Sequence, residues 1–555
     1  MAAPRFSILT PVYNTPAGVL EKMLASVETQ DYGSWELCLY DDASTEPHVR
    51  EILAAAAARD ARIRVEFAER NSGIVGASNG ALAMAGGEFI ALLDHDDLLH
   101  PDALGHVSAA IDGAPDVDYL YTDEDKITAS GQHRDPFFKP DWSPERMRTQ
   151  MYTCHLSVLR RSVVEEVGGF DPEFEGSQDW DLVLKVTERA RRVIHVPRIL
   201  YHWRMLETSA AAGGEAVKPY AFEAGKRAVQ AHCDRTGLQA EVERDPIDPG
   251  ILHLQPRLKS EPLVSIVIPT AGQRRDVRFE EVVLVVHCVR SILEDSSYEN
   301  LEIVVVYGEA TPPEVLEELR EIGGERLRLV PYEGKFNFSA KINLGAVRSR
   351  GEHLLLLNDD IEVRTEDWIE RMVMYSEQEG VGAVGGKLLW GDGRLQHVGV
   401  AFDAGRPGHY HRGFAEDYKG YSNYTLIARN CLAVTGACLM TRRSVFDQLG
   451  GLSMSFPVNF NDVDYCLKAY KEGLRIVYDP DLIMYHFESS SRDPEVKEWE
   501  LNLLQDRWLA MTMNDPFGNP ALTHGLPRIS SYVSWVKRRP GPLWKRQRRR
   551  FEPTR

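Results

Sequence analysis

The chain has 555 residues, 43% of them apolar, so it is too long for one compact core and predicts two domains of ordinary size. Its 83 acidic residues outnumber 64 basic ones and give a net charge of -19, which excludes a nucleic-acid-coating protein; no nucleic-acid partner is expected. Seven cysteines without a CxxC pair argue against a zinc knuckle and a disulfide framework and fit a reducing cytosol.

The first half predicts strands that alternate with helices. We expect strands at 6–13, 35–42, 62–68 and 89–97, and helices ending near residue 30, at 50–59 and around 78–85. This order is typical of an α/β fold with a mostly parallel, Rossmann-like sheet. Carboxylates at the strand ends then face the ligand crevice.

The same pattern restarts at 262–270 and continues with strands at 300–308, 326–333 and 351–360, so we place the boundary near 240–261. The predicted domains are 1–250 and 260–500, followed by a helical extension with a basic tail at 501–555. No cationic leader and no long apolar run is seen, which predicts a cytoplasmic protein. The basic end, 537–555, predicts peripheral contact with an anionic membrane at its inner face; a solvated, disordered end is the alternative.

Two similar sets of motifs, each with acidic residues and a histidine, occur in the same order in the two halves. The first half has FIALLDHDD (89–97), SQDWD (177–181) and YHW (201–203). The second has HLLLLNDD (353–360), FNDVD (460–464) and YHF (485–487), with an insertion that contains WGDGRLQHVGV (390–400) and GHYHRGF (408–414). Each copy therefore pairs strand-end carboxylates with a later acid pair and a histidine.

These residue types suit the departure of a nucleotide diphosphate from a sugar. Asp94 and Asp96 can hold a divalent ion that neutralises the leaving group, and His202 can complete its coordination and favour Mn²⁺ alongside Mg²⁺. Asp179 is the candidate general base for the acceptor hydroxyl. The alternatives are a solvated turn for the D-x-D, a helix N-cap for Asp179 or Asp181, and a hydrogen-bonded structural histidine.

The ordered motifs carry a family resemblance. TPVYN, DDAS, NSGIVGASNGAL, LLDHDD, GGF and SQDWDL resemble a family 2 glycosyltransferase of the GT-A fold. The second half resembles another such domain through VSIVIPT, FNFSAK, LLLLNDDIEV, GVGAVGGKL, QHVGV and FNDVDYCL. The whole is similar to tandem enzymes of bacterial surface-polysaccharide and O-antigen assembly, including rhamnosyltransferase-like ones.

The resemblance implies a metal-dependent, inverting transfer from a UDP-, dTDP- or GDP-sugar to a glycan or lipid-linked glycan, with Mn²⁺ or Mg²⁺ as cofactor. It implies that the nucleotide is held by Pro11, Tyr13, Asp41, Arg70, Asn71 and Asp94. It places metal at Asp94, Asp96, His202, Asp360 and His486, and the catalytic bases at Asp179 and Asp462. On the acceptor side it places Asp123, Asp125, His397, His409 and His411.

The second half departs from the motif on the nucleotide side. Ala271, Tyr307 and Asn358 stand where the first half has Tyr13, Asp41 and Asp94. We therefore expect a bifunctional enzyme with two different donors. The alternative is one active N-terminal transferase with a degenerate C-terminal carbohydrate- or nucleotide-binding domain.

Other classes of protein fit less well. A sugar-phosphate nucleotidyltransferase is expected to open with a Gly-rich, Arg-containing loop, but this chain has TPVYNTPAG after its first strand. A phosphatase with an Asp nucleophile does not explain the repeated second acid pair. A non-catalytic carbohydrate-binding scaffold stays open as an alternative.

Overall fold

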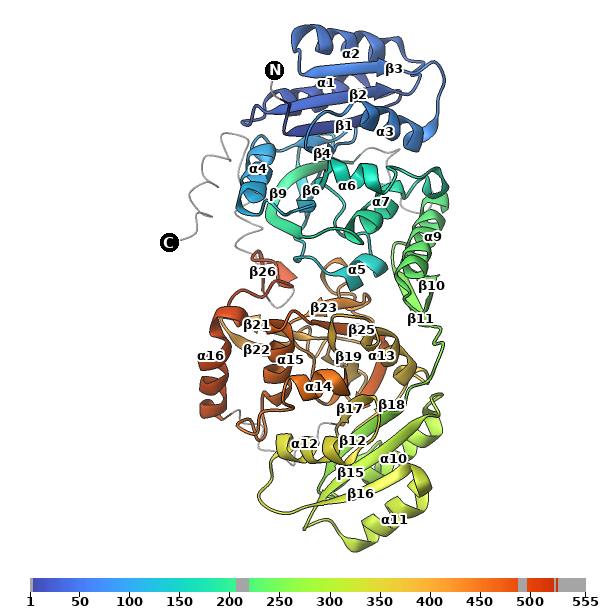
Figure 1. Cartoon of the computed structure of the whole chain (residues 1–555), viewed down its shortest axis with the longest axis vertical. Coiled ribbons are helices and arrows are strands. Elements are labelled where there is room, and N and C mark those ends of the chain that lie inside the picture. The colour runs from blue at the N-terminus through green and yellow to red at the C-terminus, as the bar shows by residue number, and fades with distance from the viewer. Residues whose placement is uncertain (1–2, 206–218, 488–496, 524–525, 528–555) are drawn as a thin grey trace.

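The structure, a computed structural model, describes residues 3–205, 219–487, 497–523 and 526–527. It contains two large β-sheets with parallel and antiparallel strand pairs, one toward each end of an elongated molecule (Figure 1). The predicted fold class, two tandem α/β domains with mostly parallel sheets, is confirmed. The predicted domain limits stay a prediction.

The first sheet has a parallel half, in which β1 pairs with β2 and β4, and a mixed half around β8, β6 and β9. In sheet order its strands are β3 (Ile63–Phe67), β2 (Trp35–Asp41), β1 (Phe6–Val12), β4 (Phe89–Leu92), β8 (Ser157–Arg160), β6 (Tyr119–Ile127), β9 (Val193–Arg204) and β5 (Leu98–Leu99), with β7 (His133–Phe137) paired to β6. Its helices are α1 (Ala17–Glu28), α2 (Pro47–Arg59), α3 (Gly73–Met84), α4 (Ala103–Gly113), α5 (Pro144–Thr149), α6 (Arg161–Glu166), α7 (Gln178–Thr187) and α9 (Pro219–Thr236).

The second sheet repeats this strand order. Its strands are β16 (Leu327–Tyr332), β15 (Leu301–Gly308), β12 (Val264–Thr270), β17 (His353–Leu357), β24 (Cys438–Arg442), β19 (Val381–Leu389), β25 (Arg475–His486) and β18 (Ile361–Val363), with β20 (Leu395–His397) on β19 and β23 (Arg429–Cys431) on β25. Its helices are α10 (Leu284–Asp295), α11 (Pro313–Gly323), α12 (Phe338–Arg348), α13 (Trp368–Ser376), α14 (Arg443–Gln448), α15 (Asn461–Lys471) and α16 (Glu498–Thr512). Short hairpins are β10 (Ala240–Arg244) with β11 (Leu252–Pro256), β13 (Arg274–Val277) with β14 (Glu280–Val283), β21 (Val400–Asp403) with β22 (Arg406–His409), and β26 (Leu522–Thr523) with β27 (Leu526–Pro527).

The central strands are buried on both faces, which explains their unbroken apolar sequences. Every residue of β1 and of β12 is buried, as expected for parallel strands covered by helices on both sides. Helix α3 begins earlier than the predicted 78–85, because Asp42 accepts hydrogen bonds from the Ser72 amide and hydroxyl just before Gly73.

Side-chain contacts show the duplication as clearly as the strand order does. Ser7 Oγ donates to Glu36 Oε1 at 2.6 Å and accepts from the Gly87 amide at 2.8 Å. The second domain repeats both contacts: Ser265 Oγ to Glu302 Oε1 at 2.7 Å, and the Gly351 amide to Ser265 Oγ at 2.7 Å. A Cβ at Gly87 would lie 2.7 Å from the Ser7 nitrogen, so the close approach needs glycine.

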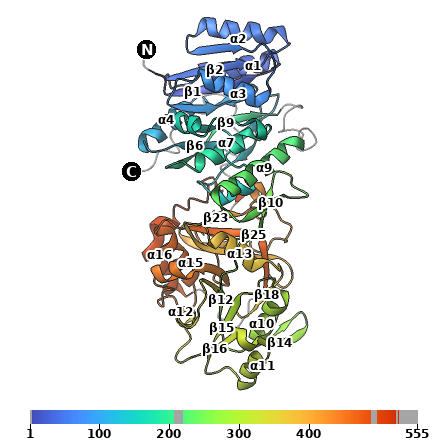
Figure 2. The same cartoon turned by 45° about the vertical axis from the view of Figure 1, so that its right-hand side comes forward.

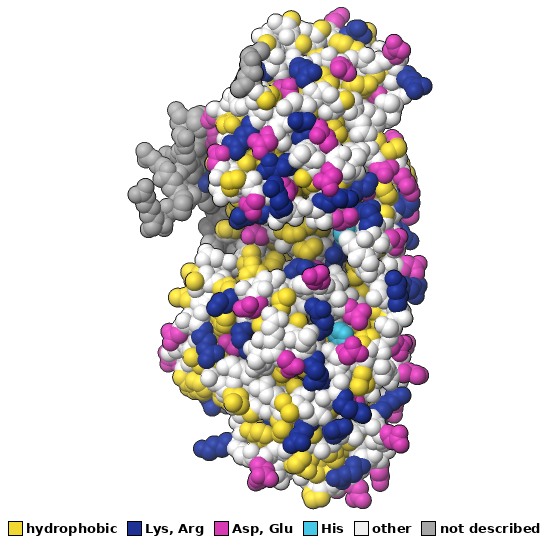
Figure 3. All heavy atoms as spheres, viewed as in Figure 1, with side chains coloured by type: hydrophobic (Ala, Val, Ile, Leu, Met, Phe, Trp, Pro, Cys, Tyr) yellow, Lys and Arg dark blue, Asp and Glu magenta, His cyan; other side chains and the backbone are white. Residues whose placement is uncertain are grey.

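The two domains meet through α5 and through the segment across the predicted boundary. That segment forms the hairpin β10–β11, which follows α9 along one side of the molecule (Figures 1 and 2). Helix α5 contacts β23, and Glu145 on α5 lies 3.1 Å from Arg475 of the second domain. Acidic and basic side chains are interspersed over the face drawn in Figure 3.

Candidate active sites

The D-H-D-D turn after β4, Asp94–Asp97, has one buried carboxylate and two that are partly exposed. Asp97 is fully buried, and it accepts from the Tyr201 hydroxyl at 2.7 Å and from the Arg204 amide at 2.6 Å. Burial and the charges of Asp94 and Asp96 raise the pKa of Asp97 well above its usual value. Asp97 therefore fixes the turn against β9.

Asp96 lies on the same turn, where the Arg204 guanidinium donates to its backbone carbonyl at 2.7 Å. Burial raises the pKa of the Asp96 carboxyl, and the neighbouring Asp94 raises it further. Two carboxylates that repel one another in a half-buried turn are stabilised by a cation, so these residues fit a divalent ion.

Asp179 lies in the first turn of α7 and shares its surroundings with Asp94. Burial raises the pKa of Asp179; Asp94 also raises it, and His155 opposes them. The helix N-cap is Ser177, so neither acid of SQDWD is the N-cap. Asp181 forms an ion pair with Lys185 at 2.7 Å, which leaves Asp179 as the acid of the site.

His155 is a residue that the motifs did not indicate. One of its ring nitrogens and carboxylate oxygens of Asp94 and Asp97 all lie within 4.8 Å of one another. The ring stacks on Tyr201 at a centroid distance of 4.5 Å, and the His155 amide donates to Glu124 Oε2 at 2.9 Å. His155 is thus a fixed neighbour of the predicted metal and base residues.

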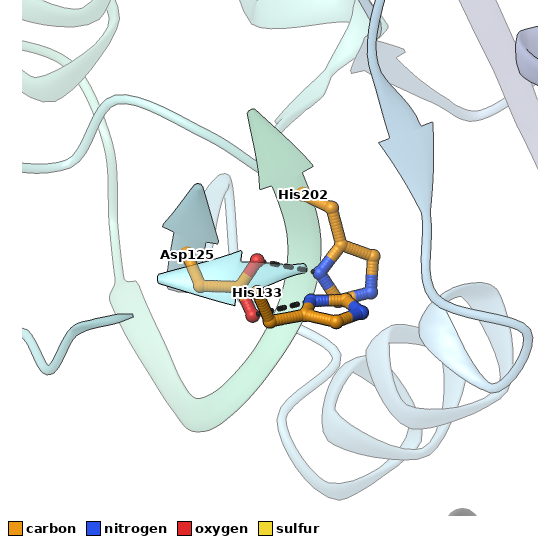
Figure 4. Close-up of side chains that lie close together, drawn as sticks. All are labelled: Asp125, His133 and His202. Atoms are coloured by element: carbon orange, nitrogen blue, oxygen red, sulfur yellow. Dashed lines mark hydrogen bonds and ion pairs between the residues drawn. The ribbon is translucent and has the colours of Figure 1, made fainter. Parts of the chain in front are cut away.

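His202 belongs to a second cluster, shown in Figure 4, with Asp125 and His133. Its Nδ1 lies 2.7 Å from Asp125 Oδ1, and His133 Nδ1 lies 3.0 Å from Asp125 Oδ2. His202 pairs with Leu98 of β5, beside the D-H-D-D turn. The predicted metal histidine is therefore next to the turn and held from β6.

The predicted nucleotide-binding residues follow the ends of neighbouring strands. Pro11 lies on β1, whose Val12 pairs with Asp41 at the end of β2. Asp41 is buried, and its Oδ1 has no hydrogen-bond partner among the described residues. Tyr13 is 45% exposed, and Arg70 and Asn71 are exposed after β3. A buried unpaired acceptor beside an exposed aromatic ring fits the recognition of a base or ribose.

Asp123, predicted on the acceptor side, is buried in a hydrogen-bond network. It accepts from the Lys139 amide at 2.8 Å and lies 2.9 Å from His195 Nε2. Asn519, from beyond α16, donates to both of its oxygens. In the structure Asp123 holds three chain segments together, and its acceptor role stays a prediction.

In the second domain Asp462 takes the place of Asp179 in the first turn of α15. Its Oδ2 accepts from the Gly436 amide at 2.7 Å, and its Oδ1 accepts from the Val463 amide at 2.8 Å. Burial raises the pKa of Asp462, and these backbone donors oppose the rise. The partner acid, Asp464, lies 3.9 Å from Lys468, as Asp181 pairs with Lys185 in the first domain.

His486 and Asp360 are brought together as the sequence predicts. His486 Nε2 lies 3.1 Å from Asp360 Oδ1 and 3.2 Å from Asn358 Nδ2. Its other nitrogen, Nδ1, lies 2.7 Å from Gln396 Oε1. The turn is one residue shorter than in the first domain, because Ile361 takes the pairing position opposite His486 that Leu98 takes opposite His202.

The insertion packs its histidines beside these residues. His397 Nε2 accepts from the amides of Gly399 and Thr435, and its Nδ1 lies 2.7 Å from His409 Nδ1. Burial and His409 lower the pKa of His397 well below its usual value. His411 is buried, and burial lowers its pKa to about 4. His397 and His411 are thus neutral rings; their acceptor role, like that of His409, stays a prediction.

The nucleotide side of the second domain is built differently. The strand register places Tyr307 where Asp41 lies, since Thr270 pairs with Tyr307 as Val12 pairs with Asp41. The Lys341 ammonium donates to the Thr270 carbonyl at 2.7 Å, and the Thr270 hydroxyl donates to Asp359 at 2.7 Å. The motifs did not single out Lys341 and Asp359 as site residues, and both face this strand end.

Within the described part of the chain, no helix is long and apolar enough to cross a membrane. The basic tail at 537–555, with its predicted membrane contact, lies outside the described residues.

Comparison with known proteins gives two family matches. Residues 7–168 match Glycosyl transferase family 2, and residues 262–508 match Glycosyltransferase like family 2. The uncharacterized protein y4gI of Sinorhizobium fredii is 42% identical over 94% of this chain and 58% of its own length. The O-antigen biosynthesis protein RfbC of Myxococcus xanthus is 36% identical over 94% of this chain and 40% of its own length. The chain thus spans about half the length of these curated relatives.

Solved structures give weaker likenesses. The structure of S. aureus TarS 1-349 in complex with UDP-GlcNAc has a TM-score of 0.35 and 22% identity, and the match covers 41% of this chain and 66% of that one.

Proposed function

Because the chain belongs to glycosyltransferase family 2, we propose that it transfers sugars from nucleotide-sugar donors to a growing glycan of a bacterial surface polysaccharide, by a metal-dependent inverting reaction. The relative named for O-antigen biosynthesis matches nearly the whole of this chain, which supports this substrate class. The observation that carries the proposal is the meeting of Asp94, Asp179 and His155 beside the strand ends.

Asp94, Asp96 and His202 would hold a divalent ion, Mn²⁺ or Mg²⁺, in the first domain, and Asp360 and His486 would do so in the second. Oxygen and imidazole donors in this combination suit either ion, with the histidine favouring Mn²⁺. The bound ion supplies positive charge that stabilises the diphosphate as it leaves. His155 is a further donor within reach of Asp94.

Asp179 would act as the general base. Its raised pKa makes it a stronger base than an exposed aspartate when it is ionised, and His155 favours the ionised form. Proton removal from an acceptor hydroxyl by a positioned carboxylate leads to attack on the face opposite the leaving group, which inverts the anomeric centre. Asp41 would accept a hydrogen bond from the nucleotide base or ribose.

We propose that both domains are active and use different donors. Asp462 keeps the buried position of a base, and His486 keeps a carboxylate partner. Lys341 and Tyr307 replace Ala77 and Asp41 of the first domain, so the donor contacts differ in charge. A degenerate second domain that only binds carbohydrate or nucleotide is the alternative that the test below separates.

The acceptor would be a glycan or lipid-linked glycan. The protein would then work in the cytoplasm, at the inner face of the membrane, with the basic tail on anionic lipid. Salt-sensitive binding to anionic liposomes that is lost on truncation at Lys537 is the expected result; unchanged binding after truncation contradicts the tail's role.

The deciding experiment is a donor screen on the full chain and on Asp179→Asn and Asp462→Asn variants. With Mn²⁺ present, UDP-, dTDP- and GDP-sugars are offered with and without glycan acceptors, and nucleotide release and product anomers are measured. Each variant is expected to lose one transfer by about 10²- to 10⁴-fold and keep the other, so each is the control for its partner. An unaffected Asp462→Asn protein supports the degenerate second domain. If the wild-type chain releases no nucleotide from any of these donors, the proposal that it is a glycosyltransferase is contradicted.

A further inference from the structure

In the first domain the position of Asp125 determines which nitrogen of His202 is protonated. A carboxylate only accepts hydrogen bonds, so the 2.7 Å contact with His202 Nδ1 needs a proton on that nitrogen. In the neutral ring, Nε2 then keeps the lone pair that a metal ion needs. Figure 4 shows the second nitrogen of His202 and of His133 on the side away from the carboxylate. Asp125 has no exposed side-chain surface, and His133 occupies its other oxygen at 3.0 Å.

In the second domain a neutral amide, that of Gln396, contacts the corresponding nitrogen of His486. His486 Nδ1 lies 2.7 Å from Gln396 Oε1, and the Asn358 amide lies 3.2 Å from His486 Nε2. Because the Gln396 oxygen accepts, Nδ1 carries the proton. Nε2 then keeps its lone pair beside Asp360 Oδ1, 3.1 Å away, so an ion would lie between two acceptors. The ring is therefore committed to the same tautomer as His202.

The two side chains that contact the Nδ1 atoms of these histidines, Asp125 and Gln396, come from different strands. Asp125 lies on β6 opposite His202, with Glu124 opposite Tyr201. In the second sheet Leu389 lies opposite Tyr485, so Trp390 follows at the position that corresponds to Asp125. The second domain has no carboxylate at this position and takes Gln396 from β20 instead.

We propose that Asp125 and Gln396 are positioning residues that hold the metal-binding histidines, and that anionic Asp125 makes the first domain bind divalent cations more tightly than the second. The inference rests on the proposed metal sites. A carboxylate behind a metal-bound histidine orients the ring and raises its basicity, and losing such a partner typically lowers metal affinity about 10- to 100-fold. A neutral amide orients the ring and adds no charge.

The test measures Mn²⁺ binding by the full chain, using electron paramagnetic resonance of free Mn²⁺ and titration calorimetry. His486→Ala leaves the first site and His202→Ala leaves the second, so each affinity is measured alone. Asp125→Asn in the His486→Ala background keeps an acceptor and removes the charge; we expect about 10- to 100-fold weaker binding. Gln396→Glu in the His202→Ala background is expected to tighten binding by about tenfold or more. Asp116→Asn, at an exposed surface ion pair, controls for net charge and is expected to leave both affinities unchanged.

The outcomes separate this inference from the proposed function. If the chain binds Mn²⁺ no better than a variant lacking both histidines, the proposed metal sites themselves fail. If both sites bind Mn²⁺ but neither Asp125→Asn nor Gln396→Glu changes its affinity, or if the second site is the tighter one, the positioning inference is overturned while the metal sites stand. Should Asp125→Asn not fold, as judged by its melting curve, the Gln396→Glu measurement decides alone.

Discussion

His253 on β11 gives a prediction about stability that can be worked out from its two partners. Its Nδ1 lies 2.8 Å from Asp481 of the second domain, and its Nε2 lies 3.0 Å from Asp245 of the hairpin. Burial lowers the pKa of the ring, but the two carboxylates outweigh burial and raise it to about 9. The imidazolium therefore links the β10–β11 hairpin to β25 at the point where the pairing of β25 with β19 shifts register.

The pKa of His253 in the folded chain is above the unfolded value of 6.5, so the charged ring stabilises the fold at low pH more than at high pH. The stability that this charge contributes is fully present below pH 6.5 and is lost as the pH rises through 9. The gap between 6.5 and 9 corresponds to about 3 kcal/mol, of which about 2.5 kcal/mol is present at pH 7.

The assay is urea unfolding of the wild-type chain and of His253→Gln between pH 6 and pH 10. The difference in the free energy of unfolding is expected to shrink by about 3 kcal/mol across this range. His353→Gln is the matched control, since burial lowers the pKa of His353 to about 4 and that ring is neutral throughout. A His253→Gln difference that does not change with pH would refute the reasoning that the ring is charged.

Two further predictions concern packing. Ser7→Ala and Ser265→Ala are each expected to lower stability by about 1–3 kcal/mol, by a similar amount in the two domains. Each change removes one donor from a buried carboxylate that keeps its other donors, and it leaves a glycine amide without its serine acceptor. Urea unfolding measures the loss, and unequal effects would contradict the equivalence of the two contacts. Glu145→Gln is expected to cost about 1–3 kcal/mol, since it removes the charge of a buried carboxylate that pairs with the partly exposed Arg475. Arg192→Gln in an exposed pair is expected to cost under about 1 kcal/mol. Calorimetry that finds equal costs would contradict this.

The sequence predicts the sheets well because their strands are buried on both faces and therefore apolar throughout. Strands expected at 35–42 and 300–308 form as Trp35–Asp41 and Leu301–Gly308. Strand pairing between distant segments, such as β8 with β4 and β6, leaves no comparable periodic signal. The role of α5 in joining the domains was likewise not predictable, because its partners Ala428 and Arg475 are far away in the sequence.

The candidate site could be predicted only where the two halves agree. Asp179 and Asp462 were found because they recur, and both lie in the first turn of equivalent helices. The motifs do not indicate His155, because Ala437 stands at the corresponding position, next to Gly436, whose amide donates to Asp462. The motifs do not indicate Lys341 and Asp359 for a related reason, since these two residue types occur at their positions in the second half alone. Recurrence in the two halves therefore indicates residues that both sites share, and it does not indicate residues that belong to one site alone.

The contact between Asn519 and Asp123 has a consequence for the order in which the protein is made. Nearly four hundred residues are synthesised after Asp123 before the amide that binds both of its oxygens emerges. Domains generally fold as they leave the ribosome, amino-terminal end first. We therefore expect Asp123 to lack one of its donors until the segment after α16 has been synthesised. The last contact of this buried carboxylate is therefore expected to form only after the second domain has been synthesised.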